Sequence, residues 1–298
     1  MEIKKILVPV DFSEYSDEAL VLAVQMARHY QARMTLAHVV VYFPDEFEEE
    51  ASYQQYQAVM VQRAARAEQK LKQQAGKHAA EGVKVDHVVL HGSSPADALQ
   101  EYIDSQTFDL VIMGTRGWNR VRQTAQGSVS ELTVRRAPIP VMTVQKNSQK
   151  NDRIQRILVP VDFSIYSRQA LEYAISIAQK YDAKLVLIHV VEQEVYPAFY
   201  DDRVESIFEV DQNLTNSVIA NLHDFVADLV DGSLVEAFVV REGVAHKEIV
   251  SYVNEQSVDL LVIATHGLTG LEYLLLGSTA EKVIRWAVCP VLTIKRID

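Results

Sequence analysis

Short runs of apolar residues alternate with longer amphipathic stretches along the whole chain. The apolar runs are rich in Val, Ile and Leu, and some of them, such as residues 260–264 (Leu-Leu-Val-Ile-Ala), contain no polar position. A strand without a polar position is typical of a parallel sheet that is covered by helices on both faces. The pattern therefore predicts an α/β fold in which strands and helices alternate.

The periodicity also places the individual elements. In the first half, we expect strands at about residues 3–10, 34–41, 83–91, 109–114 and 139–145, and helices at about residues 16–30, 51–80, 95–106 and 128–136. The strands of the second half are expected near residues 154–161, 184–191, 234–241, 258–264 and 290–295. We expect Ser16, or Ser167 in the second half, to cap the first helix, because a hydroxyl there can accept backbone N–H bonds.

The sequence contains an internal duplication. Residues 6–13 (Ile-Leu-Val-Pro-Val-Asp-Phe-Ser) return unchanged at residues 157–164. The offset is 151 residues early in the chain and 150 late, so the second copy has lost one residue. A duplication this regular indicates two tandem domains, which we assign to residues 1–146 and 153–298. Each is long enough to bury a core of its own.

The charge of the chain limits the classes of partner. The net charge is −11, with 16 Lys/Arg against 18 Asp/Glu up to residue 146 and 13 against 22 after it. Binding to nucleic acid without sequence preference depends on cationic surface, so we expect no nucleic-acid partner.

The compartment is predicted from three further features. No apolar run reaches the length of a membrane span, so no membrane partner is expected. The first residues follow a strand pattern and lack the layout of a signal peptide. The single cysteine, Cys289, cannot form an internal disulfide, which fits a reducing compartment. We therefore expect a cytoplasmic protein.

Candidate chemistry lies where the fourth expected strand of each half ends. Residues 114–117 (Gly-Thr-Arg-Gly) are followed, after nine residues, by residues 127–128 (Gly-Ser). In the second half, residues 264–267 (Ala-Thr-His-Gly) are followed at the same spacing by residues 277–279 (Gly-Ser-Thr). Glycines let the backbone approach a sugar or phosphate closely, and the N-terminus of the next helix favours anions. Neither a Walker A loop nor a GxGxxG dinucleotide motif occurs.

These residues resemble the universal stress protein family, whose ATP-binding pattern is G-x2-G-x9-G-[ST]. Residues 114–128 match the pattern fully, and residues 264–278 match it except that Ala264 replaces the first glycine. The Pro-x-Asp-x-Ser segments at residues 9–13 and 160–164 are similar to the family as well. The resemblance covers both halves. For each half it implies an open five-stranded parallel sheet, in the order 3-2-1-4-5 and sandwiched by helices, of the kind found in adenine nucleotide alpha hydrolases.

The resemblance also implies a ligand, namely ATP or the related ADP or AMP. It assigns adenine contacts to the backbone or side chains of Asp11, Val40, Asp162 and Val191, and ribose contacts to Gly114 and Ala264. It assigns phosphate contacts to Gly117, Gly127, Ser128, Gly267, Gly277 and Ser278. We count Pro9, Pro160, Arg116, His266 and Thr279 as further candidate binding residues. We expect magnesium only through the nucleotide phosphates, and no metal site of the protein itself.

Three alternatives at the site stay open. Asp11 and Asp162 can contact adenine or simply cap the turn after the first strand. Arg116 and His266, which occupy equivalent positions, can face phosphate or solvent. If Ala264 must adopt a positive φ, the penalty is about 1–2 kcal/mol, or roughly ten-fold in affinity; if its Cβ instead points at the ribose, the loss is larger. We expect both halves to bind, with a mild preference for the second.

The favoured function is adenine-nucleotide binding in stress response or signalling. The alternative is a dimerisation or interaction module whose pockets are vestigial, and a homodimer of whole chains or an unknown protein partner fits either function. Catalysis ranks last, with slow ATP hydrolysis or autophosphorylation as its upper limit. No base is placed by sequence beside Ser128 or Ser278, and no acids are arranged for a dedicated magnesium site.

Overall fold

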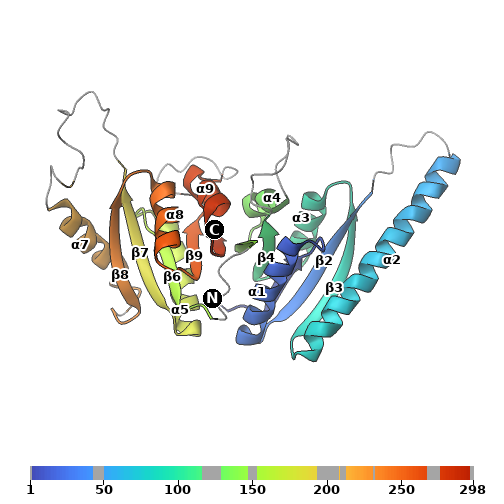
Figure 1. Ribbon diagram of the computed structural model, residues 1–298, viewed down its shortest axis with the longest axis horizontal. Helices are drawn as coiled ribbons and strands as arrows, with labels where there is room; N and C mark the ends of the chain where they lie inside the picture. Colours follow the sequence, from blue (N-terminus) through green and yellow to red (C-terminus); the bar gives the residue numbers. More distant parts are fainter. Residues whose placement is uncertain are drawn as a thin grey trace, which may run out of the picture. The chain divides into compact units, whose positions relative to one another are not determined.

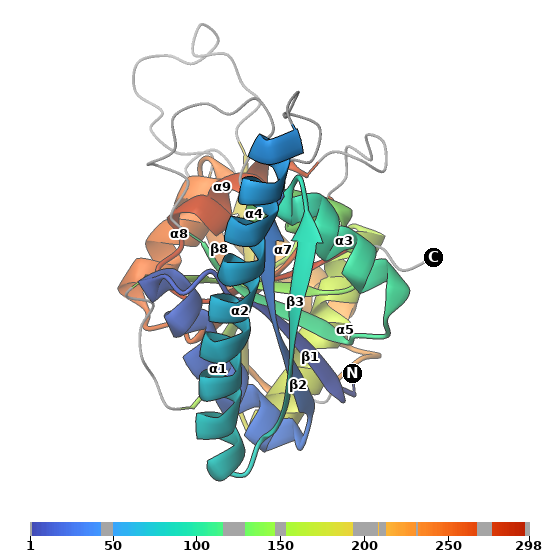
Figure 2. The same ribbon diagram turned by 90° about the vertical axis from the view of Figure 1, so that its right-hand side faces the viewer.

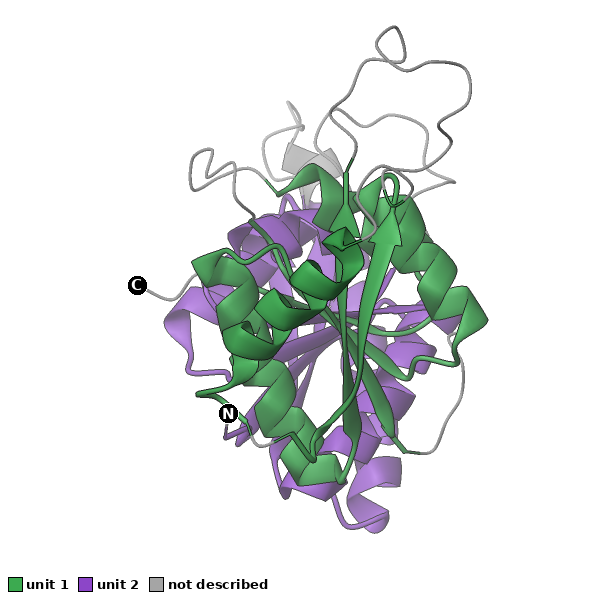
Figure 3. Ribbon diagram, turned by 90° about the vertical axis from the view of Figure 1, so that its left-hand side faces the viewer, with its two compact units in different colours: residues 1, 147–298 green, residues 2–146 purple. Residues whose placement is uncertain are grey.

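The chain forms two compact units, which we call the N-terminal repeat (residues 2–146) and the C-terminal repeat (residues 147–298). The computed structural model describes residues 2–42, 50–115, 129–146, 153–192, 208, 213–230, 232–266 and 276–295. Figure 1 labels the helices and strands of both units, and Figure 3 shows the N-terminal repeat in purple and the C-terminal repeat in green.

The N-terminal repeat contains a parallel sheet with the strand order β3-β2-β1-β4-β5. Its strands are β1 (Lys5–Pro9), β2 (Arg33–Val41), β3 (Lys84–Gly92), β4 (Leu110–Thr115) and β5 (Val141–Gln145). Its helices are α1 (Glu14–Tyr30), α2 (Glu50–Ala80), α3 (Pro95–Ser105) and α4 (Val129–Arg136). Right-handed crossovers place α1 and α2 on one face of the sheet and α3 and α4 on the other. Figure 2 shows α2 running beside β3, with which it packs.

The C-terminal repeat has the same arrangement, with the parallel strand order β8-β7-β6-β9-β10. Its strands are β6 (Arg156–Pro160), β7 (Lys184–Val191), β8 (Val235–Glu242), β9 (Leu260–Ala264) and β10 (Val291–Ile294). Its helices are α5 (Ile165–Tyr181), α7 (Leu214–Val226), α8 (Ala245–Glu255) and α9 (Ser278–Trp286). The expected α/β fold and the strand order implied by the family resemblance are both confirmed.

The central strands form the core of each repeat. Ile6, Leu7 and Val8 of β1 have no exposed surface, and every residue of β9 is buried. Burial on both faces explains why β9 contains no polar position and why Lys5, at the exposed start of β1, is the one polar residue of that strand. The periodicity in the sequence therefore located the strands to within about two residues of their observed ends, the usual uncertainty of element boundaries.

An aspartate that the sequence analysis did not single out anchors the first strand of each repeat. The carboxylate of Asp109, just before β4, accepts hydrogen bonds from the backbone amides of Lys4 and Lys5 at 2.7 and 2.8 Å. Asp259 does the same for Gln155 and Arg156, at 2.8 and 2.9 Å. These bonds set the stagger between the two adjacent strands and satisfy amides at the start of the strand.

The single deleted residue of the second copy lies in one turn. Gly92, the last residue of β3, and Gly243, which directly follows β8, are 151 residues apart, whereas the helix N-caps Ser94 and Val244 are 150 apart. The deletion therefore shortens the connection that leads into α8. It also removes a capping side chain, because Ser94 caps α3 whereas Val244 has no side-chain cap bond.

The expected cap of the first helix is wrong by three residues. The N-cap of α1 is Ser13, whose side-chain oxygen accepts a hydrogen bond from the amide of Ser16 at 3.4 Å. Ser164 caps α5 in the same way through the amide of Ser167, at 3.1 Å. The later serines instead lie inside the first turn, where their hydroxyls donate back to the carbonyl oxygens of the two capping residues.

None of the helices in the described part of the chain has an apolar stretch long enough to cross a membrane. The longest is α2, with 31 residues, but Gln, Lys, Arg and Glu recur along its whole length. A spanning helix needs about 20 predominantly apolar residues.

The revised cap leads to a prediction about stability. Replacing Ser13 by Ala removes the acceptor for the first turn of α1 and is expected to destabilise the protein by about 0.5–2 kcal/mol. Replacing Ser16 by Ala is the matched control and should have a smaller effect, because Ala is the better helix former inside the first turn. Urea unfolding of the three proteins measures the difference, and an equal or larger effect of the Ser16 variant would contradict the assignment.

Candidate functional site

The candidate site lies where the strand order reverses, at the carboxyl ends of β1 and β4. β1 pairs with β2 on one side and with β4 on the other, although β4 follows β1 by about 100 residues. The connections after β1 and β4 lead in opposite directions, which makes this the switch point of the sheet, where open parallel sheets generally have a crevice. Ligands of open parallel sheets bind at such a switch point. In the C-terminal repeat the equivalent strands are β6 and β9.

Asp11 organises the turn that follows β1. Its Oδ1 atom accepts hydrogen bonds from both the amide and the hydroxyl of Ser13, at 3.0 and 2.5 Å. Asp162 repeats both bonds with Ser164, at 3.0 and 2.6 Å. The Oδ1 atoms of both aspartates therefore cap the turn, as one of the two alternatives predicted. This capping also holds each carboxylate in a defined place at the crevice, where an aspartate that caps a turn can still accept from a ligand.

The residue inside this turn has an unusual backbone conformation. Phe12 has a φ of 60° and Phe163 a φ of 62°, in the left-handed region that bulky side chains rarely adopt. Each ring lies against a histidine of the next strand, with 4.6 Å between the ring centroids of Phe12 and His38, and 4.8 Å between those of Phe163 and His189. Backbone strain of this kind is held in place by the surrounding contacts and is concentrated at functional sites.

The two histidines are themselves held by the turn. Nδ1 of His38 lies 2.7 Å from the carbonyl oxygen of Val10, and Nδ1 of His189 lies 2.7 Å from that of Val161. Each histidine thus joins the end of the second strand to the residue just before the aspartate. Together the aspartate, phenylalanine, serine and histidine form one unit, which we call the Asp-Phe-Ser turn and which occurs in both repeats.

The residues that the resemblance assigns to adenine lie beside this turn. Pro9 and Pro160 end the first strands, and Val40 and Val191 lie at or next to the ends of the second strands. The ladder between the first and second strands stops three residues before each of these valines, at Ala37 and at Ile188. The edge of the second strand beyond that point is not covered by the first strand, which is where an adenine edge can meet backbone groups.

Aromatic side chains surround Val40 in the N-terminal repeat, and the sequence analysis did not single them out. Val40 packs with Met60 of α2, and Phe12, Tyr42 and Tyr56 lie against this cluster. The rings of Tyr42 and Tyr56 are stacked, with 5.6 Å between their centroids. The sequence signal that could have identified this cluster is the presence of tyrosines close to the predicted adenine contact Val40.

The C-terminal repeat has different neighbours around the same turn. Phe163 meets Phe225 of α7 edge to face at 5.6 Å. Arg168 lies over the Phe225 ring and forms an ion pair with Asp228. The two candidate base sites thus share the Asp-Phe-Ser turn but differ in the side chains that surround it.

Gly114 has a structural role that the sequence did not predict. A Cβ atom at this position would lie 2.3 Å from the carbonyl oxygen of Tyr15 and 2.9 Å from the amide nitrogen of Ser16. The glycine is therefore required for the close approach of β4 to the first turn of α1. Its φ is not positive, and neither is that of Ala264, so the backbone penalty considered for Ala264 does not arise.

The start of α9 brings together two of the predicted phosphate residues, Gly277 and Ser278, and the further candidate Thr279. Gly277 is the N-cap of α9, and its amide donates to the carbonyl oxygen of Thr265 at 2.8 Å. A Cβ at Gly277 would lie 3.0 Å from the same oxygen. Ser278 and Thr279 form the first turn of the helix, which has no side-chain cap. A helix start of this kind presents free N–H groups and the positive end of the helix dipole to an anion.

His266 lies between Thr265 and this helix start. Its Nδ1 atom is 3.0 Å from the Thr265 hydroxyl oxygen, and its Nε2 atom is buried without a hydrogen-bond partner. Burial lowers the pKa of His266, and the positive charge of Lys295 lowers it further. The imidazole is therefore biased towards its neutral form, and a phosphate beside it would favour the charged form instead.

The remaining predicted residues, Arg116, Gly117, Gly127, Ser128 and Gly267, lie outside the described residues. The last described residue before them in the N-terminal repeat, Thr115, is 1% exposed, and its hydroxyl has no hydrogen-bond partner. Among the residues that the structure describes, no group of three or more His, Cys, Asp or Glu side chains could hold a metal ion.

Comparison with known proteins gives consistent results for both repeats. The model of the universal stress protein family matches residues 2–145 and 153–295. A universal stress protein of Methanocaldococcus jannaschii is 36% identical over 143 residues, which is 48% of this chain and 82% of the relative. A universal stress protein E homolog of Haemophilus influenzae is 27% identical over 229 residues, covering 74% of this chain and 72% of the relative. The crystal structure of a universal stress protein from Archaeoglobus fulgidus covers 99% of this chain and 100% of its own, with a TM-score of 0.71 and 22% sequence identity.

The close approach at Gly114 predicts a difference between the repeats. Replacing Gly114 by Ala is expected to destabilise the protein by about 1–3 kcal/mol, because the new methyl group overlaps the backbone of Tyr15. The reverse change at the equivalent position, Ala264→Gly, adds no atom. It should lower the free energy of unfolding by about 0.5–1 kcal/mol, because glycine loses more backbone freedom on folding than alanine. Denaturant unfolding compares the two variants with the parent, and a neutral Gly114 variant would refute the close approach.

Proposed function

Because the chain belongs to the universal stress protein family, we propose that each repeat binds an adenine nucleotide, ATP or the related ADP or AMP, and that the protein acts in stress response or signalling. The observation that carries the proposal is the Asp-Phe-Ser turn, which places a fixed carboxylate at the switch point of each sheet. The rest of the proposed site is arranged around that carboxylate.

The carboxylate supports a preference for adenine. An ionised Asp11 or Asp162 only accepts hydrogen bonds, and the exocyclic amino group of adenine donates them. Guanine carries a carbonyl oxygen at the corresponding position, which a carboxylate repels, so adenine is preferred when the base is held with its 6-position towards the carboxylate. The uncovered edge of the second strand, at Val40 and Val191, offers backbone groups to the remaining polar atoms of the base. We therefore expect ATP to bind more tightly than GTP.

The proposed phosphate end is the start of α9 in the C-terminal repeat. Its first turn is uncapped, Gly277 brings no side chain, and His266 stands beside it. These features suit a polyanion, which gains from helix N–H groups and from protonation of a neighbouring histidine. Magnesium would enter only with the phosphates. In the N-terminal repeat we propose the same role for residues 127–128, with Arg116 in the place of His266.

The proposed function is binding, not catalysis. In the described part of the site no base lies within hydrogen-bond reach of the Ser278 hydroxyl, so nothing supports a nucleophilic role for it. The one cysteine, Cys289, is buried, and burial raises its pKa to about 12, so its thiol stays protonated and unreactive. We keep the cytoplasm as the proposed compartment and the mild preference for the C-terminal repeat as part of the proposal.

Asn substitutions provide the sharpest test of the site. Asp11→Asn keeps an oxygen that can accept from Ser13, and so preserves the turn, but it removes the negative charge that faces the base. Because hydrogen bonds to charged groups contribute about 1.5–3 kcal/mol, ATP affinity of the N-terminal repeat should fall about ten-fold or more. The same change at Asp162 should affect the C-terminal repeat. Isothermal titration of each single variant and of the double variant measures both the affinity and the number of sites per chain.

The controls separate binding from loss of structure and from the alternative function. Both Asn variants should still unfold cooperatively, with midpoints only moderately below that of the parent because the bonds to Ser13 and Ser164 remain but lose the charge of their acceptor. A thermal-shift series with ATP, ADP, AMP and GTP should rank the adenine nucleotides above GTP. Mass spectrometry of ligand released from freshly purified protein identifies the natural occupant. If the parent binds no adenine nucleotide at millimolar concentration, the interaction-module alternative replaces this proposal. Release of phosphate over time would instead reveal an ATPase.

A further inference from the structure

The start of helix α8 in the C-terminal repeat is held by a side chain from a neighbouring strand. The N-cap residue of the helix, Val244, has no side-chain atom that can accept a hydrogen bond. Instead, the carboxylate of Glu192 accepts from the amide of Ala245, the first residue of α8, with 2.8 Å between Oε1 and the nitrogen. Glu192 directly follows Val191, the last residue of β7. The bond therefore ties the end of β7, next to a predicted adenine contact, to the start of α8.

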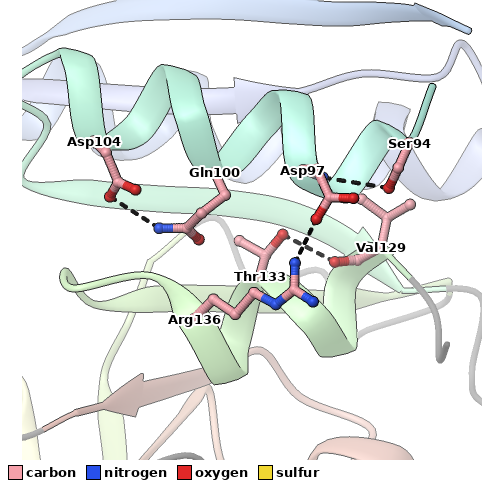
Figure 4. A network of polar contacts seen from close by, with 7 residues as sticks. All are labelled: Ser94, Asp97, Gln100, Asp104, Val129, Thr133 and Arg136. Atoms are coloured by element: carbon pink, nitrogen blue, oxygen red, sulfur yellow. Dashed lines mark hydrogen bonds and ion pairs between the residues drawn. The ribbon is translucent and has the colours of Figure 1, made fainter. Parts of the chain in front are cut away.

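The N-terminal repeat caps the equivalent helix from within. Figure 4 shows Ser94, whose hydroxyl oxygen accepts from the amide of Asp97 in α3, and the ion pair that Asp97 forms with Arg136 of α4 at 2.5 Å. The equivalent positions of the C-terminal repeat, at the offset of 150 residues, are Val244, Lys247 and Trp286. Neither the cap nor the ion pair can form from these residues, so the start of α8 depends on a group from another element.

Both partners of the bond between Glu192 and Ala245 are absent from the N-terminal repeat. At the offset of 151 residues, Glu192 corresponds to Val41, the last residue of β2, whose side chain has no acceptor. At the offset of 150, Ala245 corresponds to Pro95, which lies in the first turn of α3 and has no backbone N–H. Donor and acceptor thus occur together in one repeat and are missing together from the other, which indicates that the two positions act as a pair.

The strand end that this bond holds has an open edge. In the described part of the chain, the ladder between β6 and β7 ends at Ile188, whose carbonyl oxygen also accepts from the amide of Val161 at 2.8 Å. Beyond that point β7 still pairs with β8, as far as the bond from the amide of Gly243 to the carbonyl oxygen of Val191 at 3.1 Å. The opposite edge is the place proposed for the base. Its position therefore depends on how firmly β8 and α8 hold the strand.

The surroundings of Glu192 favour a fixed negative charge. The start of α8 presents the positive end of its helix dipole to the carboxylate. Burial lowers the pKa of the neighbouring His246, the charges of Lys282 and Lys247 lower it further, and the charge of Glu192 raises it. The carboxylate thus lies close to two cations as well as to the helix start. A hydrogen bond to an ionised acceptor is stronger than one between neutral groups, so the anchor is well suited to hold the strand.

We propose that Glu192 is a positioning residue for the adenine base in the C-terminal repeat. Through Ala245 it holds the end of β7 against the start of α8, and so keeps the open edge of the strand in the place where it meets the base. Groups that are fixed before a ligand arrives lose less freedom on binding. The inference rests on the proposed function, and it gives a structural reason for the preference for this repeat, because Val41 and Pro95 cannot form such a bond.

Removing either partner of the bond tests the proposal. Glu192→Val and Ala245→Pro each introduce the residue of the N-terminal repeat, and the extended backbone of Val244 (φ −85°, ψ 117°) is compatible with a following proline. In an Asp11→Asn background, which weakens the N-terminal site, each change should lower the ATP affinity of the C-terminal repeat about two- to ten-fold by isothermal titration. The double variant should lose no more than either single one, because both remove the same bond.

Three controls separate positioning from stability. Glu192→Gln keeps an oxygen that can accept from the amide and should retain most of the affinity. Val244→Ser, added to Glu192→Val, gives α8 the kind of cap that Ser94 gives α3, and should raise the unfolding midpoint without restoring the affinity. Adenosine, which has no phosphates, should lose affinity by the same factor as ATP, because the bond acts on the base end of the site.

Hydrogen exchange provides a readout that needs no nucleotide. The amides of residues 189–192 should exchange faster in Glu192→Val and in Ala245→Pro than in the parent, and Val244→Ser should not slow them. Unchanged exchange and ATP affinity in both variants overturn the inference alone, and so does an affinity that returns together with the unfolding midpoint. A parent that binds no adenine nucleotide overturns the proposed function and this inference with it.

Discussion

The turn after the first strand of each repeat is the constraint around which the rest of the site is arranged. It holds a phenylalanine at positive φ, a conformation that costs about 1–2 kcal/mol. Two bonds from Ser13 to the Asp11 carboxylate and the tilted ring contact between Phe12 and His38 offset that strain. The turn starts α1, supplies its cap and places the carboxylate at the switch point of the sheet. The same atoms make the same contacts around Asp162, so the arrangement is a property of the duplicated unit.

The close packing of β4 against α1 follows from this geometry. The turn brings the first residues of α1 over the end of β4, where a Cβ at Gly114 would overlap the Tyr15 backbone. The glycine that the family pattern assigns to ribose thus has a structural reason to be glycine in the N-terminal repeat. In the C-terminal repeat Ala264 occupies the equivalent place as a buried strand residue. A family motif can therefore contain positions whose residue type is set by packing as well as by a ligand.

The two repeats have the same backbone arrangement but differ in the side chains on their surfaces. Strand order, the anchoring aspartates Asp109 and Asp259 and the Asp-Phe-Ser turn are shared. The side chains around the proposed base site and the outer side of the last two helices are not. Duplication makes this possible because the core of each domain has to be preserved, while an outward position changes stability little and is free to acquire a new role.

The sequence by itself determined where the elements lie, that there are two domains and to which family they belong. Burial on both faces demands apolar runs, and this demand is local enough to be visible in residues 260–264 without knowing their neighbours. Only the tertiary structure decided the cap at Ser13, the reason for Gly114, and the pairing of Asp97 with Arg136. The cap depends on the backbone conformation between Asp11 and Ser16, and the other two depend on the distance between atoms of different segments. Such distances are set when helices pack on a sheet, and no pattern within one segment records them.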